Sequence, residues 1–164
     1  MKLVSCLALL AKADEYNYVR QTTNGPIKGF GYDESLEHSE IYLPEKVAQD
    51  VLINEPYDTE IYQGIPYAQP PTGNLRWRPP KPAESWDGEY DATYTRASCA
   101  RTDFTPTYGE DCLYLNVFVP KAAVKDGRKV AVGVWLHGGG FEAGAGGVLL
   151  YDGRFWAAES TWCW

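Results

Sequence analysis

The stretch VWLHGGGFEAG, at residues 134–144, places three consecutive glycines between an apolar run and an aromatic residue. Glycine lets the backbone turn with positive φ and keeps side chains out of the space beside it. Such a turn can aim several N–H groups at one point, where they stabilise the negative charge that develops on a carbonyl oxygen in acyl transfer. The spacing therefore predicts an oxyanion-binding loop. A flexible glycine loop beside a hydrogen-bonded histidine is the alternative.

Phosphate binding is a weaker interpretation of the same glycines. Residues 138–143 match G-x-G-x-x-A, the pattern of a dinucleotide-binding turn that opens a helix. Glu142 would repel a pyrophosphate there, and the further glycines at 144, 146 and 147 disfavour the helix whose N-terminus should meet it. No G-K-[ST] follows, which excludes a P-loop. We therefore expect no nucleotide, no metal and no other cofactor.

The elements that must position this loop are mainly strands. Asn24-Gly25 is a strong two-residue hairpin signal and predicts strands over Tyr16–Thr22 and Pro26–Tyr32. Two further strands are predicted at Leu113–Val119 and Val130–Leu136. The second is almost entirely apolar, as in a strand covered on both faces. A helix is expected to begin at Gly153.

Between these strands the sequence predicts loops. Residues 33–60 mix acids with scattered aliphatic residues and indicate a variable surface insertion. The prolines of GIPYAQPPTGNLRWRPPKP, residues 64–82, exclude a regular element. Residues 85–99 continue as loop, with a turn at Asp87-Gly88.

Length and composition fit one globular domain. The chain has 164 residues, 45% of them hydrophobic and 14% aromatic. A formal net charge of −7 makes nucleic acid or an anionic membrane surface a poor partner. No apolar run approaches the roughly 18 residues that a membrane-spanning helix needs.

The first residues have the pattern of a signal peptide. Lys2 precedes an apolar stretch over 3–11, and Ala11-Lys12-Ala13 matches an A-x-A cleavage site. Residues 1–13 are thus predicted to be removed after Ala13, with secretion of residues 14–164. A short N-terminal strand or helix is the alternative. Cleavage would also remove Cys6 and leave three cysteines, an odd number.

Among these three, Cys99 and Cys112 are a candidate bridge that closes a short polar loop in an oxidising compartment. Cys163 is then left unpaired, one residue from the end of the chain.

Four sequence blocks resemble type-B carboxylesterases and cholinesterases and occur in the same order as in that family, from about Tyr18 to Glu159. They are GIPYAQPPTGNLRWRPP, SWDGEYDATYTRASC, GEDCLYLNVFVP, and WLHGGGFEAG with YDGRF. The chain is similar to the N-terminal part of members several times longer. The resemblance implies an α/β fold, the N-terminal part of an α/β-hydrolase. This part comprises a leading β-hairpin, long proline-rich loops, the first central strands and the oxyanion-hole loop, in an incomplete sheet.

The resemblance also implies roles for residues of the loop. Gly139 and Gly140 resemble the two oxyanion-hole donors that the loop supplies, and Phe141 resembles a residue bordering the acyl pocket. His137 resembles the residue that opens the loop, with a structural role rather than that of the catalytic base.

Two pairs outside the loop are implied in the same way. Cys99 and Cys112 resemble the first disulfide of the family. Arg76 and Glu110 resemble its internal salt bridge, with two unrelated surface charges as the alternative. The segment between the two cysteines contains no tryptophan, whereas the longer loop of cholinesterases supplies one that binds the choline cation. Choline esters are therefore not the expected substrates.

The catalytic triad of the family has no counterpart in this sequence. The family places a serine in G-x-S-x-G, then an acidic residue, then a histidine. None of the serines lies in such a sequence, and the two histidines, His38 and His137, come too early in the chain. The final TWCW, where a family member would continue into another strand, indicates a truncated product.

Three functional hypotheses follow. The first is a piece of a secreted serine carboxylic-ester hydrolase, inactive alone, whose partner is a small-molecule ester. The second is a non-catalytic, cholinesterase-like adhesion protein that binds another protein. The third is a truncated product without activity of its own.

Overall fold

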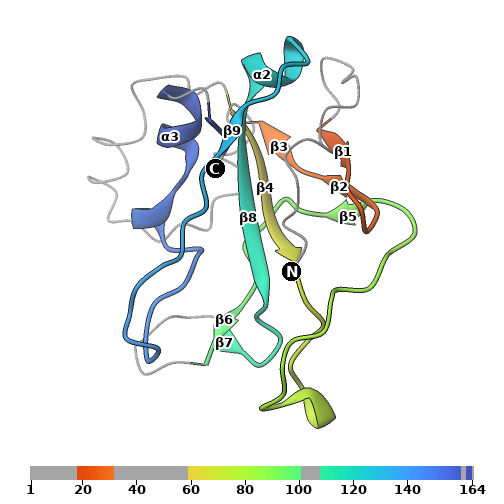
Figure 1. Cartoon of the computed structure of the whole chain (residues 1–164), viewed down its shortest axis with the longest axis vertical. Coiled ribbons are helices and arrows are strands. Elements are labelled where there is room, and N and C mark those ends of the chain that lie inside the picture. Colours follow the sequence, from red (N-terminus) through yellow and green to blue (C-terminus); the bar gives the residue numbers. More distant parts are fainter. Residues whose placement is uncertain (1–17, 32–58, 101–107, 160–161, 164) are drawn as a thin grey trace.

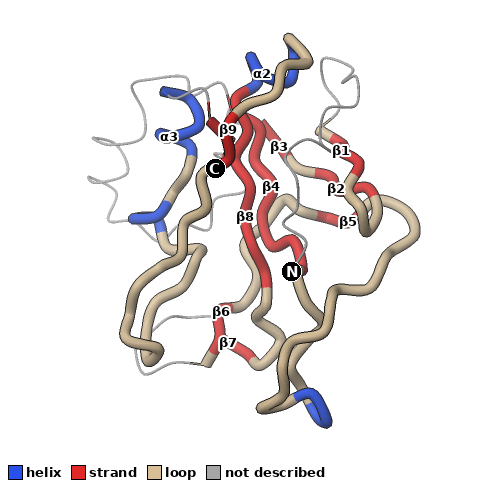
Figure 2. Tube along the Cα trace, viewed as in Figure 1, coloured by secondary structure: helices blue, strands red, loops and turns tan. Residues whose placement is uncertain are grey.

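The structure is a computed structural model that describes residues 18–31, 59–100, 108–159 and 162–163 (Figure 1). Its strands are short apart from two. The elements are β1 (Val19–Gln21), β2 (Pro26–Lys28), β3 (Phe30–Gly31), β4 (Thr59–Pro66), β5 (Tyr90–Asp91), β6 (Ser98–Cys99), β7 (Tyr108–Gly109), β8 (Tyr114–Pro120), α2 (Lys121–Lys125), β9 (Ala131–Val132), α3 (Arg154–Glu159) and β10 (Trp162–Cys163), with 3-10 turns at Gly73–Leu75 and Leu149–Tyr151. Long loops connect them, as Figure 2 shows in tan.

The centre of the molecule is a three-stranded antiparallel sheet in the order β3-β4-β8. The two long strands run side by side through the middle of Figure 1, with Thr59 opposite Pro120 and Ile61 opposite Phe118. Nearly every residue of β4 is buried. Because side chains alternate across a strand, this burial requires cover on both faces of the sheet.

Two apolar clusters provide that cover. On one face, Ala157 of α3 packs with Phe30, Ile61 and Phe118. A second cluster is built around side chains that alternate with these along the strands: Ile27, Tyr62, Ile65, Ala92, Val117, Val119 and Cys163. Helix α3 and the leading hairpin therefore hold β4 and β8 between them. The alternation is regular at 117–119 of β8, whereas in β4 the irregularity between Tyr62 and Ile65 places both of these residues in the second cluster.

Strand β4 was not predicted from the sequence. Its first residues fall in the segment interpreted as a surface insertion, and its last fall in the proline-rich stretch expected to contain no regular element. The prediction was wrong because Pro66 is the final residue of the strand, where a missing N–H interrupts no further ladder. Gly64 lies within a bulge between Tyr62 and Ile65, with φ of +69°.

The leading hairpin is confirmed. Strands β1 and β2 pair antiparallel with Val19 opposite Lys28, and Thr22 N–H donates to the Gly25 carbonyl at 3.1 Å. The second predicted strand is divided at Gly29, where an added Cβ would lie 2.2 Å from the Ile61 carbonyl oxygen. This close approach lets the chain pass from β2, which pairs with β5, to β3, which pairs with β4.

The strand predicted at Val130–Leu136 is mostly absent. Only β9 forms, parallel to β10, and the side chains of Val134, Trp135 and Leu136 are 60%, 53% and 85% exposed. The prediction assumed that elements would cover both faces of this segment. In the described part of the chain α3 packs on β4 and β8 instead, and Trp135 contacts the ring of Tyr151.

The expectation that Cys163 is unpaired is also wrong. Its side chain is 1% exposed, it belongs to the core cluster around Tyr62, and its sulfur is disulfide-bonded. The expectation depended on removing Cys6 with residues 1–13, and that segment lies outside the described residues. The predicted helix start at Gly153 is confirmed by α3. The side chain of Asp152 accepts from the Arg154 N–H at 2.9 Å and so caps the helix.

A buried ion pair joins the hairpin to the sheet. The Arg20 guanidinium donates to Glu60 Oε1, the Tyr62 hydroxyl donates to Glu60 Oε2 at 2.7 Å, and Arg20 also donates to the Val19 carbonyl at 2.8 Å. Arg20 and Glu60 are 1% and 5% exposed. Charges so deep are stable only when paired and hydrogen-bonded, so this network fixes how β1 sits against β4.

Buried tyrosines make the fold sensitive to alkali. Burial, and then the negative charge of Glu60, raise the pKa of Tyr62 well above its ordinary value of 10.0. Burial and a hydrogen bond with Asp111 raise the pKa of Tyr114 to about 12. Unfolded tyrosines lose their protons near pH 10 while these two keep theirs, so the free energy of unfolding should fall as the pH rises from 10 to 12.

Tyrosinate absorbance and circular dichroism, followed together in an alkaline titration, test this expectation. Part of the tyrosinate signal should appear only as the protein unfolds. In Tyr62→Phe the dependence of stability on pH should be weaker. Titration of all tyrosines near pH 10, with the fold intact, would contradict it.

Candidate functional site

The glycine loop makes a tight turn at Gly139. The Gly139 carbonyl accepts from the N–H groups of Glu142 and Ala143 at 3.1 and 3.0 Å. Gly139 and Gly140 have φ of +132° and +63°, and Phe141 follows with +64°, a value uncommon for a residue with a side chain. The backbone therefore departs from helix and strand at the residues predicted to bind an oxyanion.

Steric contacts explain why positions 139 and 144 of the loop carry glycine. An added Cβ on Gly139 would lie 2.0 Å from the Ala143 carbonyl oxygen. One on Gly144 would lie 2.4 Å from the Gly138 carbonyl oxygen and 2.6 Å from His137 Nδ1. Both ends of the turn thus pack backbone against backbone, and no other residue fits without moving the loop.

The N–H groups of Gly139 and Gly140 donate no hydrogen bond within the described part of the chain. Both residues are exposed, and an added Cβ on Gly140 would meet open space. These are consecutive donors on an accessible turn, as an oxyanion site requires. The Phe141 side chain beside them is fully exposed.

His137 has its contact inside the loop. Its ring Nδ1 lies 2.8 Å from the Gly138 carbonyl oxygen, so a proton on Nδ1 is donated to that oxygen. In the part of the chain that the structure describes, His137 makes no hydrogen bond to a serine or a carboxylate. His38 lies outside the described residues.

One polar residue that contacts the loop was not singled out from the sequence. Asn116, in the middle of β8, donates from Nδ2 to the Gly146 carbonyl at 3.3 Å. The available signal was a lone amide inside the otherwise apolar strand sequence YLNVFVP.

The structure contains the disulfide between Cys99 and Cys112. The two Cα atoms are 4.9 Å apart, and the bond links Cys99 of β6 to Cys112, which lies between β7 and β8. Residues 101–107, between the two cysteines, lie outside the described residues. Tyr108 is largely exposed at the end of that segment.

Arg76 and Glu110 form a two-pronged ion pair. Arg76 Nε donates to Glu110 Oε1 at 2.8 Å, and a terminal nitrogen donates to Oε2 at 2.6 Å. The hydrogen bonds and charge of each partner lower the pKa of Glu110 and raise that of Arg76. Both side chains are about half exposed, so the pair lies at the surface and water screens it.

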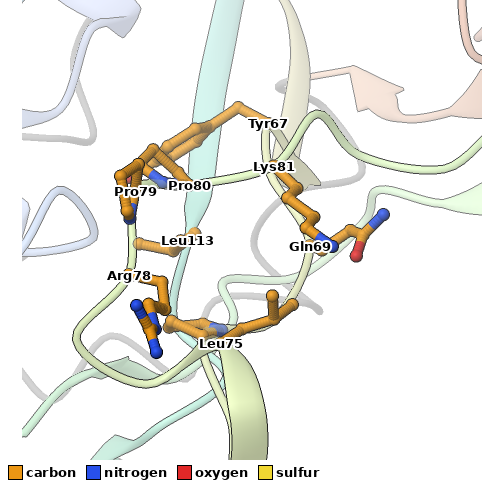
Figure 3. Close-up of a pocket in the computed structure, with 9 residues that line it drawn as sticks. Tyr67, Gln69, Leu75, Arg78, Pro79, Pro80, Lys81 and Leu113 are labelled. Carbon is orange, nitrogen blue, oxygen red and sulfur yellow. The ribbon is translucent and has the colours of Figure 1, made fainter.

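A pocket of about 250 Å³ lies elsewhere, in the proline-rich segment (Figure 3). Its wall is largely apolar and includes Leu75, Pro79 and Leu113, with the cations of Arg78 and Lys81 and the phenol of Tyr67. Burial raises the pKa of Tyr67. Among the described residues that line it there is no carboxylate, histidine, serine or cysteine.

Among the described residues, no helix has the length and apolar character needed to span a membrane.

Comparisons with known proteins identify the family. The family described as "Carboxylesterase family" matches residues 49–161. Acetylcholinesterase 1 of Caenorhabditis elegans is 43% identical over 114 residues, which are 61% of this chain and 18% of the relative. Para-nitrobenzyl esterase of Bacillus subtilis is 42% identical over 106 residues, which are 60% of this chain and 21% of the relative.

A solved structure gives the same result for the fold. The carboxylesterase of Geobacillus stearothermophilus superposes with a TM-score of 0.66 and 32% sequence identity, over 89% of this chain and 25% of that one. The chain thus spans about a fifth of the length of the curated relatives it matches. The sequence blocks, the incomplete α/β-hydrolase sheet and the matched family together identify this chain as a member of the carboxylesterase family.

Proposed function

We propose that this chain supplies the oxyanion-hole part of a secreted serine carboxylic-ester hydrolase and hydrolyses no ester by itself. The observation that carries the proposal is the pair of N–H groups at Gly139 and Gly140, which donate no hydrogen bond among the described residues. They lie on a turn where an added Cβ at Gly139 or Gly144 would meet backbone atoms. Membership of the carboxylesterase family supports the reaction class.

In the proposed mechanism a serine oxygen attacks the ester carbonyl, and negative charge moves onto the carbonyl oxygen. The N–H groups of Gly139 and Gly140 donate to that oxygen more strongly in the transition state than in the ground state, which lowers the barrier. The alcohol leaves, an acyl-serine remains, and water releases it. Phe141 borders the acyl side. The serine, the acid and the base are supplied from outside this sequence.

The substrate is proposed to be a small carboxylic ester without a choline group. The relatives are named for different esters, so membership of the family does not fix the alcohol. The sequence between Cys99 and Cys112 has no tryptophan and thus no indole face for a quaternary ammonium ion. The Cys99–Cys112 bond, together with the leader predicted over residues 1–13, supports secretion into an oxidising compartment.

A non-catalytic binding role is the second candidate. The sequence has no serine in G-x-S-x-G, and the exposed Trp135 and Leu136 offer an apolar surface to another protein. The unbonded N–H groups of the glycine loop favour the enzyme, because adhesion makes no use of them.

A chimera tests the proposed function. Residues 134–147 of this chain replace the aligned loop of para-nitrobenzyl esterase, and hydrolysis of a para-nitrobenzyl ester is measured. The chimera should retain turnover. Adding Gly139→Ala should reduce kcat by roughly a hundredfold, because the methyl group meets the Ala143 carbonyl oxygen and displaces the donors.

Gly146→Ala in the same chimera is the matched control, since an added Cβ there meets open space. It should leave kcat within a few-fold. The unmodified 164-residue chain serves as the blank and should give no turnover. A folded but inactive chimera, or serine-dependent turnover by the chain alone, would reject the proposal.

A further inference from the structure

We propose that Asn116 is a positioning residue, which holds the glycine loop against the central sheet and so sets the place of the Gly139 and Gly140 donors. This inference rests on the proposed function, since the loop in question is the proposed oxyanion site. Asn116 touches neither glycine. It acts through Gly146, which follows them in the same loop.

Both the oxygen and the nitrogen of the Asn116 side-chain amide form hydrogen bonds. Its Oδ1 accepts from the Gly64 N–H at 3.0 Å, and its Nδ2 donates to the Gly146 carbonyl at 3.3 Å. An amide flip would set oxygen against oxygen and nitrogen against nitrogen, so the two contacts together define one orientation. One side chain of β8 therefore connects the bulge of β4 to the glycine loop.

The bulge is a rigid anchor. The Gly64 carbonyl accepts from the Tyr90 hydroxyl at 2.9 Å, so both polar groups of this residue are bonded. An added Cβ on Gly64 would lie 2.4 Å from Arg96 Cγ and 2.9 Å from the Tyr94 carbonyl oxygen. Strand β5, strand β8 and the segment after β5 thus enclose Gly64, and Asn116 transmits this fixed position to the loop.

The loop meets the sheet side at a second point next to the first. An added Cβ on Gly147 would lie 2.3 Å from Thr95 Cγ2, so the backbone there lies directly against the segment that encloses Gly64. Upstream, Gly144 packs on Gly138 and His137. Fixing Gly146 and Gly147 therefore keeps Gly144 packed against the start of the turn. The turn itself is closed at Gly139, whose carbonyl accepts from the N–H groups of Glu142 and Ala143.

Asn116→Asp separates the two contacts. A carboxylate keeps an oxygen that can accept from the Gly64 N–H, but it presents its other oxygen to the Gly146 carbonyl in place of a donor. The sheet contact should persist and the loop contact should be lost. Asn116→Ala removes both and should disturb the bulge as well.

The readout is amide hydrogen exchange in the full chain. In Asn116→Asp, amide exchange at Glu142 and Ala143 should be faster by roughly tenfold, because the loss of one hydrogen bond frees the turn. Amide exchange in residues 59–66 and the midpoint of thermal unfolding should change little. In spectra with ¹⁵N-labelled glycine, the resonances of Gly139 and Gly140 should move, and that of Gly29 should not. A purely structural role would move all of these together.

Asn24→Asp is the matched control, because Asn24 Nδ2 likewise donates to a carbonyl, that of Ala83, at 3.0 Å. It should leave exchange in 138–147 unchanged. Unchanged exchange at Glu142 and Ala143 in Asn116→Asp would overturn the inference and leave the proposed ester chemistry untouched. If the variant fails to fold, hydrogen exchange of the side-chain NH₂ protons of Asn116, measured in the unaltered chain, tests the inference instead. Slowed exchange of these protons supports the inference, and exchange at the rate of a free amide overturns it.

Discussion

Replacing Glu60 by glutamine is expected to lower the free energy of unfolding by about 3–5 kcal/mol, the cost of removing one charge from a buried ion pair. Arg20 is 1% exposed, so water cannot replace the carboxylate that it loses. Its bond to the neutral Val19 carbonyl is a weaker contact than its bond to Glu60. The Tyr62 hydroxyl would also exchange a charged acceptor for a weaker one.

Urea-induced unfolding followed by circular dichroism measures this loss. Glu110→Gln is the matched control, because it makes the same chemical change in an ion pair whose side chains are about half exposed. Its midpoint should stay close to that of the unaltered chain, since water screens the pair and solvates the freed Arg76. Equal midpoints for the two variants would mean that burial does not govern the strength of the Arg20–Glu60 pair.

Removing the disulfide between Cys99 and Cys112 should have an effect of similar size. The bond closes a loop with a sequence separation of 13, and a loop of that length restrains the unfolded chain by about 3 kcal/mol. The double variant Cys99→Ala, Cys112→Ala should therefore unfold at clearly lower urea concentration. The pairing of β6 with β7, which lies within the segment that the bond closes, should be the first structure to loosen.

The alanine variant is preferable to a reducing agent, because Cys163 is also disulfide-bonded and a reductant would act on both bonds. Serine at the same two positions provides a second variant with a polar side chain of nearly the same size. A double variant as stable as the unaltered chain would mean that the bond adds nothing to the fold.

Features that depend on a short stretch of sequence could be predicted. Asn24-Gly25 predicted the hairpin because a two-residue turn is a local signal that needs no knowledge of the remaining chain. The glycine turn was predicted for the same reason, and its steric cause, the contact of Gly139 with Ala143, spans only four residues.

Features that depend on distant partners were missed. Strand β4 lies inside a sequence interrupted by Gly64 and ended by Pro66, and its pairing with β3 and β8 makes it a strand. Asn116 likewise gains its role from Gly64 and Gly146, far from it in the sequence. At 130–136 the error was the opposite one, because apolar character predicted burial, whereas the side chains of Val134, Trp135 and Leu136 are exposed.

Residues 130–136 also bear on the solubility of the chain. They read VAVGVWL, seven consecutive residues without charge or proline and rich in β-forming side chains, the composition of segments that stack into cross-β assemblies. The net charge of −7 opposes association between molecules, yet none of it lies within the segment. We therefore expect association at high concentration to begin at these seven residues.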